Sequence, residues 1–122
     1  MALLKKVYHS STCTTNQRIL KEVKPGKDFE FHDIRNEPIS ASQVDEMARV
    51  AGSYEALFSR VALKYRILGL HEKKLTEKDY RKYIMQEYTF LKRPVFIIGD
   101  EIFIGNSKKN VAAVKDKMKR SR

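Results

Sequence analysis

The chain has 122 residues, of which 33% are charged and 42% hydrophobic, and it contains a single cysteine. This length suits one domain that buries a core without disulfide staples. One cysteine excludes an internal disulfide, and no cysteine and histidine spacing predicts zinc, so we expect a reducing, cytoplasmic setting with no metal and no bound cofactor. No stretch has the apolar length of a signal peptide or a membrane span, so we expect no membrane association.

The formal charge of +10 comes from 25 Lys plus Arg against 15 Asp plus Glu. A positive potential attracts anions of every size, from small oxyanions to nucleic acid. Much of the excess lies in residues 115–122, a pattern typical of a solvated helix end. The aromatic residues are spaced like core positions and do not interleave with the basic ones, so the pattern does not favour direct nucleic-acid binding.

The first third of the chain predicts a βαβ unit. We expect a strand over residues 5–9 and a helix over residues 14–24, which Pro25-Gly26 ends. A second strand follows, in which Phe29 and Phe31 alternate with polar residues and face a core. Parallel pairing with a right-handed crossover is the default geometry of such a unit.

The middle third, about residues 40–90, is predicted to be helical. Ser40 and Gln43 form a capping box, so a helix begins at Ser40 and continues to Gly52. The other segments expected here are a short helix at 54–58, a loop or broken helix at 65–70, and a helix that Thr76 and Asp79 cap.

The last third predicts a hairpin and a helix. Apolar runs at 94–98 and 102–104 flank Gly99-Asp100-Glu101, which indicates antiparallel strands, and Ser107 caps a final helix. The complete order is β-α-β, helices, β-β-α. It predicts an α/β protein with a thioredoxin-like fold: one domain over residues 1–122, a four-stranded mixed sheet with flanking helices, and a helical insertion between the two halves.

Cys13 lies where the first strand gives way to the first helix. The unpaired N–H groups of a helix's first turn favour a thiolate, so a cysteine at such a junction can have a lowered pKa and act as a nucleophile. The alternative is a small buried residue without chemistry, because free cysteine usually packs like a small hydrophobe.

Four short motifs lie in order along the chain, and together they resemble a known family. The motifs are Tyr8-His9-x-x-x-Cys13-Thr14, Leu57-Phe58-Ser59-Arg60, Tyr65-Arg66-x-Leu68-Gly69-Leu70 and Lys92-Arg93-Pro94-Val95. Their order and spacing are similar to those of glutaredoxin-linked arsenate reductases (ArsC type) and of the related Spx proteins. The resemblance extends from about residue 6 to residue 117.

The resemblance implies a role for several residues. Cys13 matches the cysteine that attacks arsenate, and His9 matches a nearby histidine whose imidazolium would stabilise the thiolate. Arg60 and Arg93 match arginines that hold the oxyanion, for which the guanidinium fork is well suited. Taken alone, His9 is more often a strand-end histidine satisfied by backbone, and each arginine is more often a surface charge. The supporting residues are Thr14, Asn16 and Pro94, the last of which is a cis proline in thioredoxin-like proteins.

Three positions depart from the family pattern. Arsenate reductases of this type carry a third arginine where this chain has Gly105 or Asn106. The usually basic position four residues after the cysteine is Gln17, and Arg18 follows it about 100° further round the helix. Asn16 stands where Spx-type switches have a second cysteine, which excludes an internal disulfide switch.

Two functions remain open, and a third alternative is a thioredoxin-like domain whose thiol is inert. The first is an arsenate reductase-like oxidoreductase acting on arsenate or a glutathione adduct, with glutathione and glutaredoxin as the external thiol system. The alternative is a Spx-like regulatory module that docks on RNA polymerase.

Overall fold

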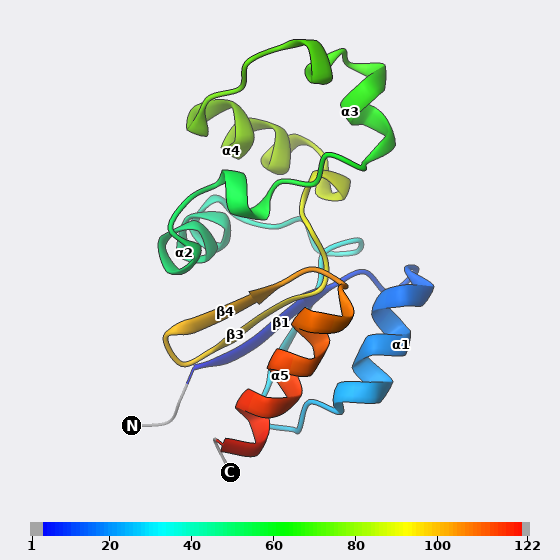
Figure 1. The fold of residues 1–122 in the computed structure, drawn as a ribbon, viewed down its shortest axis with the longest axis vertical. Coiled ribbons are helices and arrows are strands. Elements are labelled where there is room, and N and C mark those ends of the chain that lie inside the picture. Colours follow the sequence, from blue (N-terminus) through cyan, green and yellow to red (C-terminus); the bar gives the residue numbers. More distant parts are fainter. Residues whose placement is uncertain (1–3, 121–122) are drawn as a thin grey trace. The chain divides into compact units, whose positions relative to one another are not determined.

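The computed structural model describes residues 4–120 of the chain. Two compact units are present. The sheet unit comprises the residues up to 38 and those from 93 onward, and the helical unit comprises residues 39–92. Figure 1 shows both units, coloured along the sequence.

The sheet unit contains four strands in the order β2-β1-β3-β4. β1 pairs in parallel with β2 and antiparallel with β3, and β3 pairs antiparallel with β4, so the sheet is mixed. In register, Val7 on β1 lies opposite Phe31 on β2 and Phe96 on β3. The strand bounds are Lys5–His9 for β1, Glu30–Asp33 for β2, Val95–Ile98 for β3 and Glu101–Ile104 for β4.

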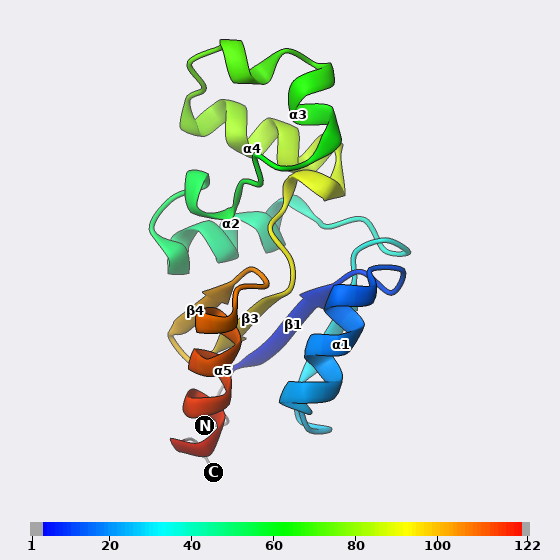
Figure 2. The ribbon, with the colours of Figure 1, turned by 45° about the vertical axis from the view of Figure 1, so that its right-hand side comes forward.

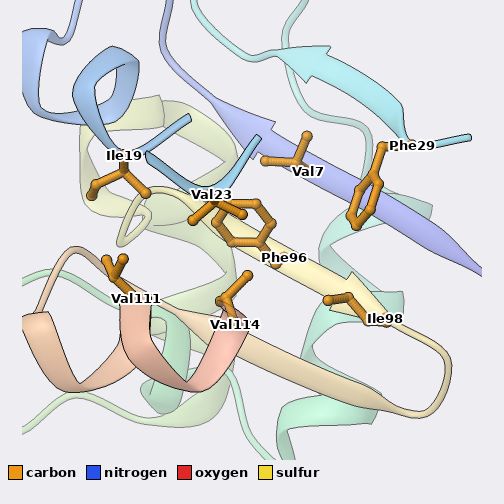
Figure 3. Packing of buried hydrophobic residues seen from close by; sticks show 8 residues of the cluster. All are labelled: Val7, Ile19, Val23, Phe29, Phe96, Ile98, Val111 and Val114. Atoms are coloured by element: carbon orange, nitrogen blue, oxygen red, sulfur yellow. The ribbon is translucent and has the colours of Figure 1, made fainter. Parts of the chain in front are cut away.

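Two helices, α1 (Thr14–Val23) and α5 (Lys108–Arg120), pack on one face of this sheet (Figures 1 and 2). Each helix turns an apolar stripe inward at the spacing of an amphipathic helix. Burial of one such side chain stabilises the fold by about 1.5–3 kcal/mol. Figure 3 shows the resulting core, formed by Val7, Ile19, Val23, Phe29, Phe96, Ile98, Val111 and Val114.

The helical unit contains three helices and three 3-10 turns. Its core includes a stacked pair of rings, Phe58 and Phe90, whose centroids are 5.1 Å apart, and Phe58 also lies 4.9 Å from the ring of Tyr80. The helices are α2 (Ala41–Ala51), α3 (Leu63–Ile67) and α4 (Glu77–Gln86), and the turns are Glu55–Leu57, Leu70–Glu72 and Tyr88–Phe90.

The predicted fold class is confirmed, including the helical insertion and the hairpin. Capping boxes begin α2 at Ser40 and α4 at Thr76, as predicted. The helix expected to Lys24 ends one residue earlier, because Lys24 adopts the left-handed conformation. The basic tail continues α5 to Arg120, and its last two residues lie outside the described part of the chain.

One core residue was predicted wrongly. Phe29 is buried, but Phe31 is 48% exposed. β2 is an edge strand of the sheet, so the side chain of Phe31 has fewer neighbours to cover it than a residue on a central strand. Its ring instead meets the imidazole of His9 edge-on, at 6.3 Å between centroids.

Candidate functional site

Cys13 is the N-cap residue of α1 and is half-buried. Its backbone N–H donates to the Ser10 carbonyl at 3.1 Å, and its carbonyl accepts from the Gln17 N–H at 3.1 Å. The Cys13 side chain makes no capping hydrogen bond. The backbone is therefore fixed by the strand-to-helix junction, while the thiol is not used to hold the helix end.

Asn16 anchors the loop that carries Cys13. Its side chain is 1% exposed, and its Oδ1 accepts the Ser10 N–H at 2.9 Å. At the next residue, the Ser11 N–H donates to Asp33 Oδ1 at 3.0 Å. Buried backbone donors need such partners, because an unsatisfied one costs about 1–3 kcal/mol. The position where a second cysteine would stand is thus occupied by a residue that fixes the loop.

The side-chain amide of Gln17 determines the state of His9. Gln17 Nε2 lies 2.9 Å from the Ser10 carbonyl oxygen and 3.3 Å from His9 Nδ1. The carbonyl requires a donor, so Nε2 is assigned as the amide nitrogen, and its second hydrogen points to an Nδ1 that accepts. The imidazole therefore carries its proton on Nε2.

The pKa of His9 agrees with a neutral ring. Burial lowers the pKa of His9 below its usual value, with a smaller raising effect from the charge of Asp33 and a further lowering by His32. This lowering favours the neutral imidazole of His9 at neutral pH.

Arg60 lies in the helical unit, whereas Cys13, His9 and Arg93 belong to the sheet unit. The Arg60 Nη2 donates to Glu55 Oε2 at 2.8 Å and to the Tyr80 hydroxyl at 2.9 Å. The guanidinium carbon lies 5.6 Å from the centroid of the Tyr80 ring. The hydrogen bond to Glu55 raises the pKa of Arg60. An oxyanion that binds Arg60 must therefore compete with the carboxylate of Glu55.

Arg93 is half-buried and lies two residues before the start of β3. The Arg93–Pro94 peptide bond is cis, as the resemblance implied. The Pro94 carbonyl accepts the N–H of Gly105 at 2.9 Å, and Gly105 has a φ of 98°. Side chains rarely adopt that conformation, so the turn favours glycine at Gly105, one of the two positions where the resemblance implies a third arginine.

A hollow of about 370 Å³ lies beside Cys13, between its loop and one face of α1. Two exposed cations, Arg18 and Lys21, face it together with polar side chains. The residues that line the hollow are Ser11, Thr12, Thr14, Gln17, Arg18 and Lys21. Sequence reasoning considered Arg18 but missed Lys21, although the spacing i, i+4, i+7 from Thr14 was the available signal.

Two further features bear on the class of site. Within residues 4–120, no group of three or more His, Cys, Asp or Glu side chains is arranged to hold a metal ion. In the same part of the chain, no helix has the length and apolar character needed to cross a membrane.

The fold and the site together define a thioredoxin-like protein with a single cysteine at the first strand-to-helix junction. Residues 8–114 match the ArsC family, and the chain belongs to that family, which includes arsenate reductases. No curated protein matches the chain.

Solved structures share this fold. An arsenate reductase from Vibrio cholerae superposes with a TM-score of 0.76 at 14% identity, over 93% of this chain and 99% of that one. An arsenate reductase-related protein from Brucella melitensis gives 0.70 at 20% identity, over 93% and 95%. A protein from Staphylococcus aureus gives 0.67 at 23% identity, over 90% and 97%. At these identities the likeness shows the fold alone.

Proposed function

We propose that this protein is an arsenate reductase-like thiol oxidoreductase with Cys13 as its only nucleophile. The observation that supports this most is the position of half-buried Cys13 at the N-cap of α1, where hydrogen bonds fix its backbone and its thiol makes no capping bond. The substrate is arsenate or a glutathione-linked disulfide. Family membership supports this class of reaction.

With arsenate, the reaction proceeds in two substitutions and one reduction. The Cys13 thiolate forms a bond to arsenic while one arsenate oxygen leaves as water, and a glutathione thiol displaces a second oxygen in the same way. The two sulfur atoms then join as a disulfide between Cys13 and glutathione, and the two electrons released reduce As(V) to As(III), which leaves as arsenite. Another glutathione thiol, presented by glutaredoxin, attacks this disulfide and frees Cys13.

The external thiol is needed because of Asn16. A thioredoxin-like protein with a second cysteine at that position resolves its own adduct, whereas the Asn16 amide has no such chemistry and is already bonded to Ser10. In this proposal glutathione and glutaredoxin supply the reducing equivalents, and we expect the activity in a reducing compartment such as the cytoplasm.

Arg93 and Arg60 bind the oxyanion in this proposal. A guanidinium keeps its charge at any physiological pH and can donate to two oxygens at once. The turn at Gly105 adds no third cation, so we expect weaker arsenate binding than in relatives that have one.

The test is arsenate-dependent oxidation of NADPH, coupled through glutathione, glutaredoxin and glutathione reductase. The wild-type protein should show turnover and Cys13→Ser should show none. Thr15→Ser, a comparably small change on the same helix, is the matched control and should keep the wild-type rate. The same comparison is made with a glutathionylated peptide in place of arsenate. Absence of Cys13-dependent turnover with both substrates would overturn the proposal.

A second candidate is a protein-binding module, similar to Spx proteins that dock on RNA polymerase. One observation favours it: α3 has no buried residue, and Val61, Leu63 and Ile67 are 94%, 77% and 67% exposed. Such a stretch of apolar surface is typical of an interaction site. Purified polymerase should bind the wild-type protein and lose affinity for Leu63→Glu. Equal or absent binding by both proteins would count against this candidate.

A further inference from the structure

We propose that the hollow beside Cys13 is the binding site for the carboxylates of glutathione, the thiol that regenerates Cys13. This inference rests on the proposed function, because it names the place where the external thiol binds. The site is defined by Arg18 and Lys21 on α1 and by the hydroxyl groups of the loop that precedes the helix.

The shape of the hollow suits a ligand of this size. Its volume of about 370 Å³ falls in the range of about 300–1,000 Å³ typical of small-molecule pockets. Thr12 and Thr14, the residues on either side of Cys13, both line it. Consecutive Cα atoms are only about 3.8 Å apart, so a ligand in the hollow lies next to the residue that bears the thiol.

The charges around the hollow favour an anion. Within residues 4–120, neither Arg18 nor Lys21 forms an ion pair, whereas Lys115 pairs with Glu22 at 3.4 Å and Lys117 with Glu101 at 3.0 Å. The first turn of α1 has no acidic residue, so the positive end of the helix dipole is not compensated either. A carboxylate would offset this accumulated positive charge.

The volume of the hollow and its positive charge together indicate the class of ligand. Cations three residues apart on one helix face can each bind a carboxylate, and the hydroxyl groups of Ser11, Thr12 and Thr14 supply hydrogen bonds to amide groups. A short peptide with two carboxylates and a thiol fits this set, and glutathione is such a peptide. A neutral thiol of similar reactivity would gain nothing from the two cations.

The first experiment measures the reaction of Cys13 with two disulfides by mass spectrometry. With glutathione disulfide, the Cys13 thiolate attacks one sulfur, forms a mixed disulfide with one glutathione and releases the other as thiolate. Arg18→Gln/Lys21→Gln should react about tenfold more slowly than wild type, a loss of about 1.4 kcal/mol in transition-state stabilisation. Its reaction with the neutral 2-hydroxyethyl disulfide should be unchanged.

The matched control is Lys27→Gln/Lys119→Gln, which removes the same two charges from exposed positions away from the hollow. It should change both rates by less than about twofold, the size of a screened long-range effect. If both double variants slow the reaction with glutathione disulfide equally, or if neither does, the proposed site is wrong. Failure of Cys13 to react even with the neutral disulfide would instead overturn the proposed function.

A second measurement tests the site without any reaction at sulfur. S-methylglutathione is titrated into Cys13→Ser and binding is followed by NMR chemical shifts. We expect saturable shifts at residues 11–21, lost in Cys13→Ser/Arg18→Gln/Lys21→Gln and kept in Cys13→Ser/Lys27→Gln/Lys119→Gln. Shifts that do not saturate, or that survive loss of Arg18 and Lys21, would overturn the inference.

Discussion

The two units of the molecule hold their cations in different ways. In the helical unit, Arg60 is fixed by Glu55 and by the hydroxyl and ring of Tyr80. In the sheet unit, Arg18 and Lys21 border a hollow beside the nucleophile and form no ion pair within residues 4–120. The first arrangement orients the Arg60 guanidinium, but the Glu55 carboxylate competes with any anion that binds there. The second leaves charge available to a ligand without orienting it.

This difference suggests that the two sets of cations bind different ligands. A small oxyanion in a transition state needs donors that are held in place, since preorganised groups contribute most there. A flexible peptide ligand is attracted mainly by charge, and exposed side chains on the protein can adjust to its carboxylates. We therefore expect losses at Arg60 or Arg93 to affect arsenate chemistry and losses at Arg18 or Lys21 to affect the thiol.

The largest expected effect tests the two proposed oxyanion arginines against each other. Arg93→Ala should lower kcat/KM for arsenate about 100-fold, equivalent to about 2.7 kcal/mol, as for loss of a hydrogen bond to a charged group. Arg60→Ala should lower kcat/KM for arsenate only about tenfold, because the Arg60 guanidinium is already paired with Glu55, which competes with the substrate. Arg49→Ala, on the surface of α2, is the control. Equal losses of kcat/KM in Arg60→Ala and Arg93→Ala would contradict the expected difference between the two arginines.

The next effect concerns the loop that shapes the hollow. Asn16→Ala should lower the free energy of unfolding by about 1–3 kcal/mol in urea titrations, because the Ser10 N–H loses its buried acceptor. Thr15→Ala, on the same turn of α1, should cost less. If Asn16→Ala is as stable as Thr15→Ala, the loop is held by other contacts and the Asn16 anchor is not needed.

A smaller effect is expected when Arg60 is released from its carboxylate. Glu55→Gln should lower the KM for arsenate by about twofold to fivefold, since a half-exposed ion pair contributes at most about 1 kcal/mol. Glu72→Gln, an exposed substitution in the same unit, should leave KM unchanged. A higher KM in Glu55→Gln would mean that Glu55 orients Arg60 for the substrate instead of competing with it.

The smallest effect is a dependence of stability on pH in the sheet unit. The pKa of His9 is lowered by burial, so the unfolded chain takes up a proton near pH 6.5 before the folded protein does. The folded state should therefore lose stability as the pH falls below about 6.5, until the folded pKa is passed. His9→Gln should flatten this slope between pH 7 and pH 5. Identical slopes in wild type and His9→Gln would contradict a lowered pKa of the half-buried His9.

Local signals predicted the fold because they act over short distances along the chain. The capping boxes at Ser40 and Thr76 and the turn between β3 and β4 each depend on neighbouring residues. Phe31 was misassigned because alternation cannot show whether a strand lies at an edge of the sheet.

The site was harder to predict, for the same reason. The place of Cys13 at a strand-to-helix junction was predicted and is confirmed, while its role stays a proposal, and Pro94 is cis as the resemblance implied. The contact between His9 and Gln17 crosses a turn, so only the folded chain reveals it. Arg60 is held by an ion pair with Glu55 and by a hydrogen bond to Tyr80, the latter 20 residues away in the chain.

The turn at Gly105 also restricts how this protein can evolve. One base change converts any glycine codon to an arginine codon, so a third cation at position 105 is easily reached by mutation. The φ of 98° there would strain the new side chain, and the gain in anion binding would be offset by a loss of stability. This one-step genetic route to a third cation is therefore opposed by the backbone. A lineage under arsenate selection should acquire its extra cation elsewhere, with the neighbouring, exposed Asn106 as the first place to look.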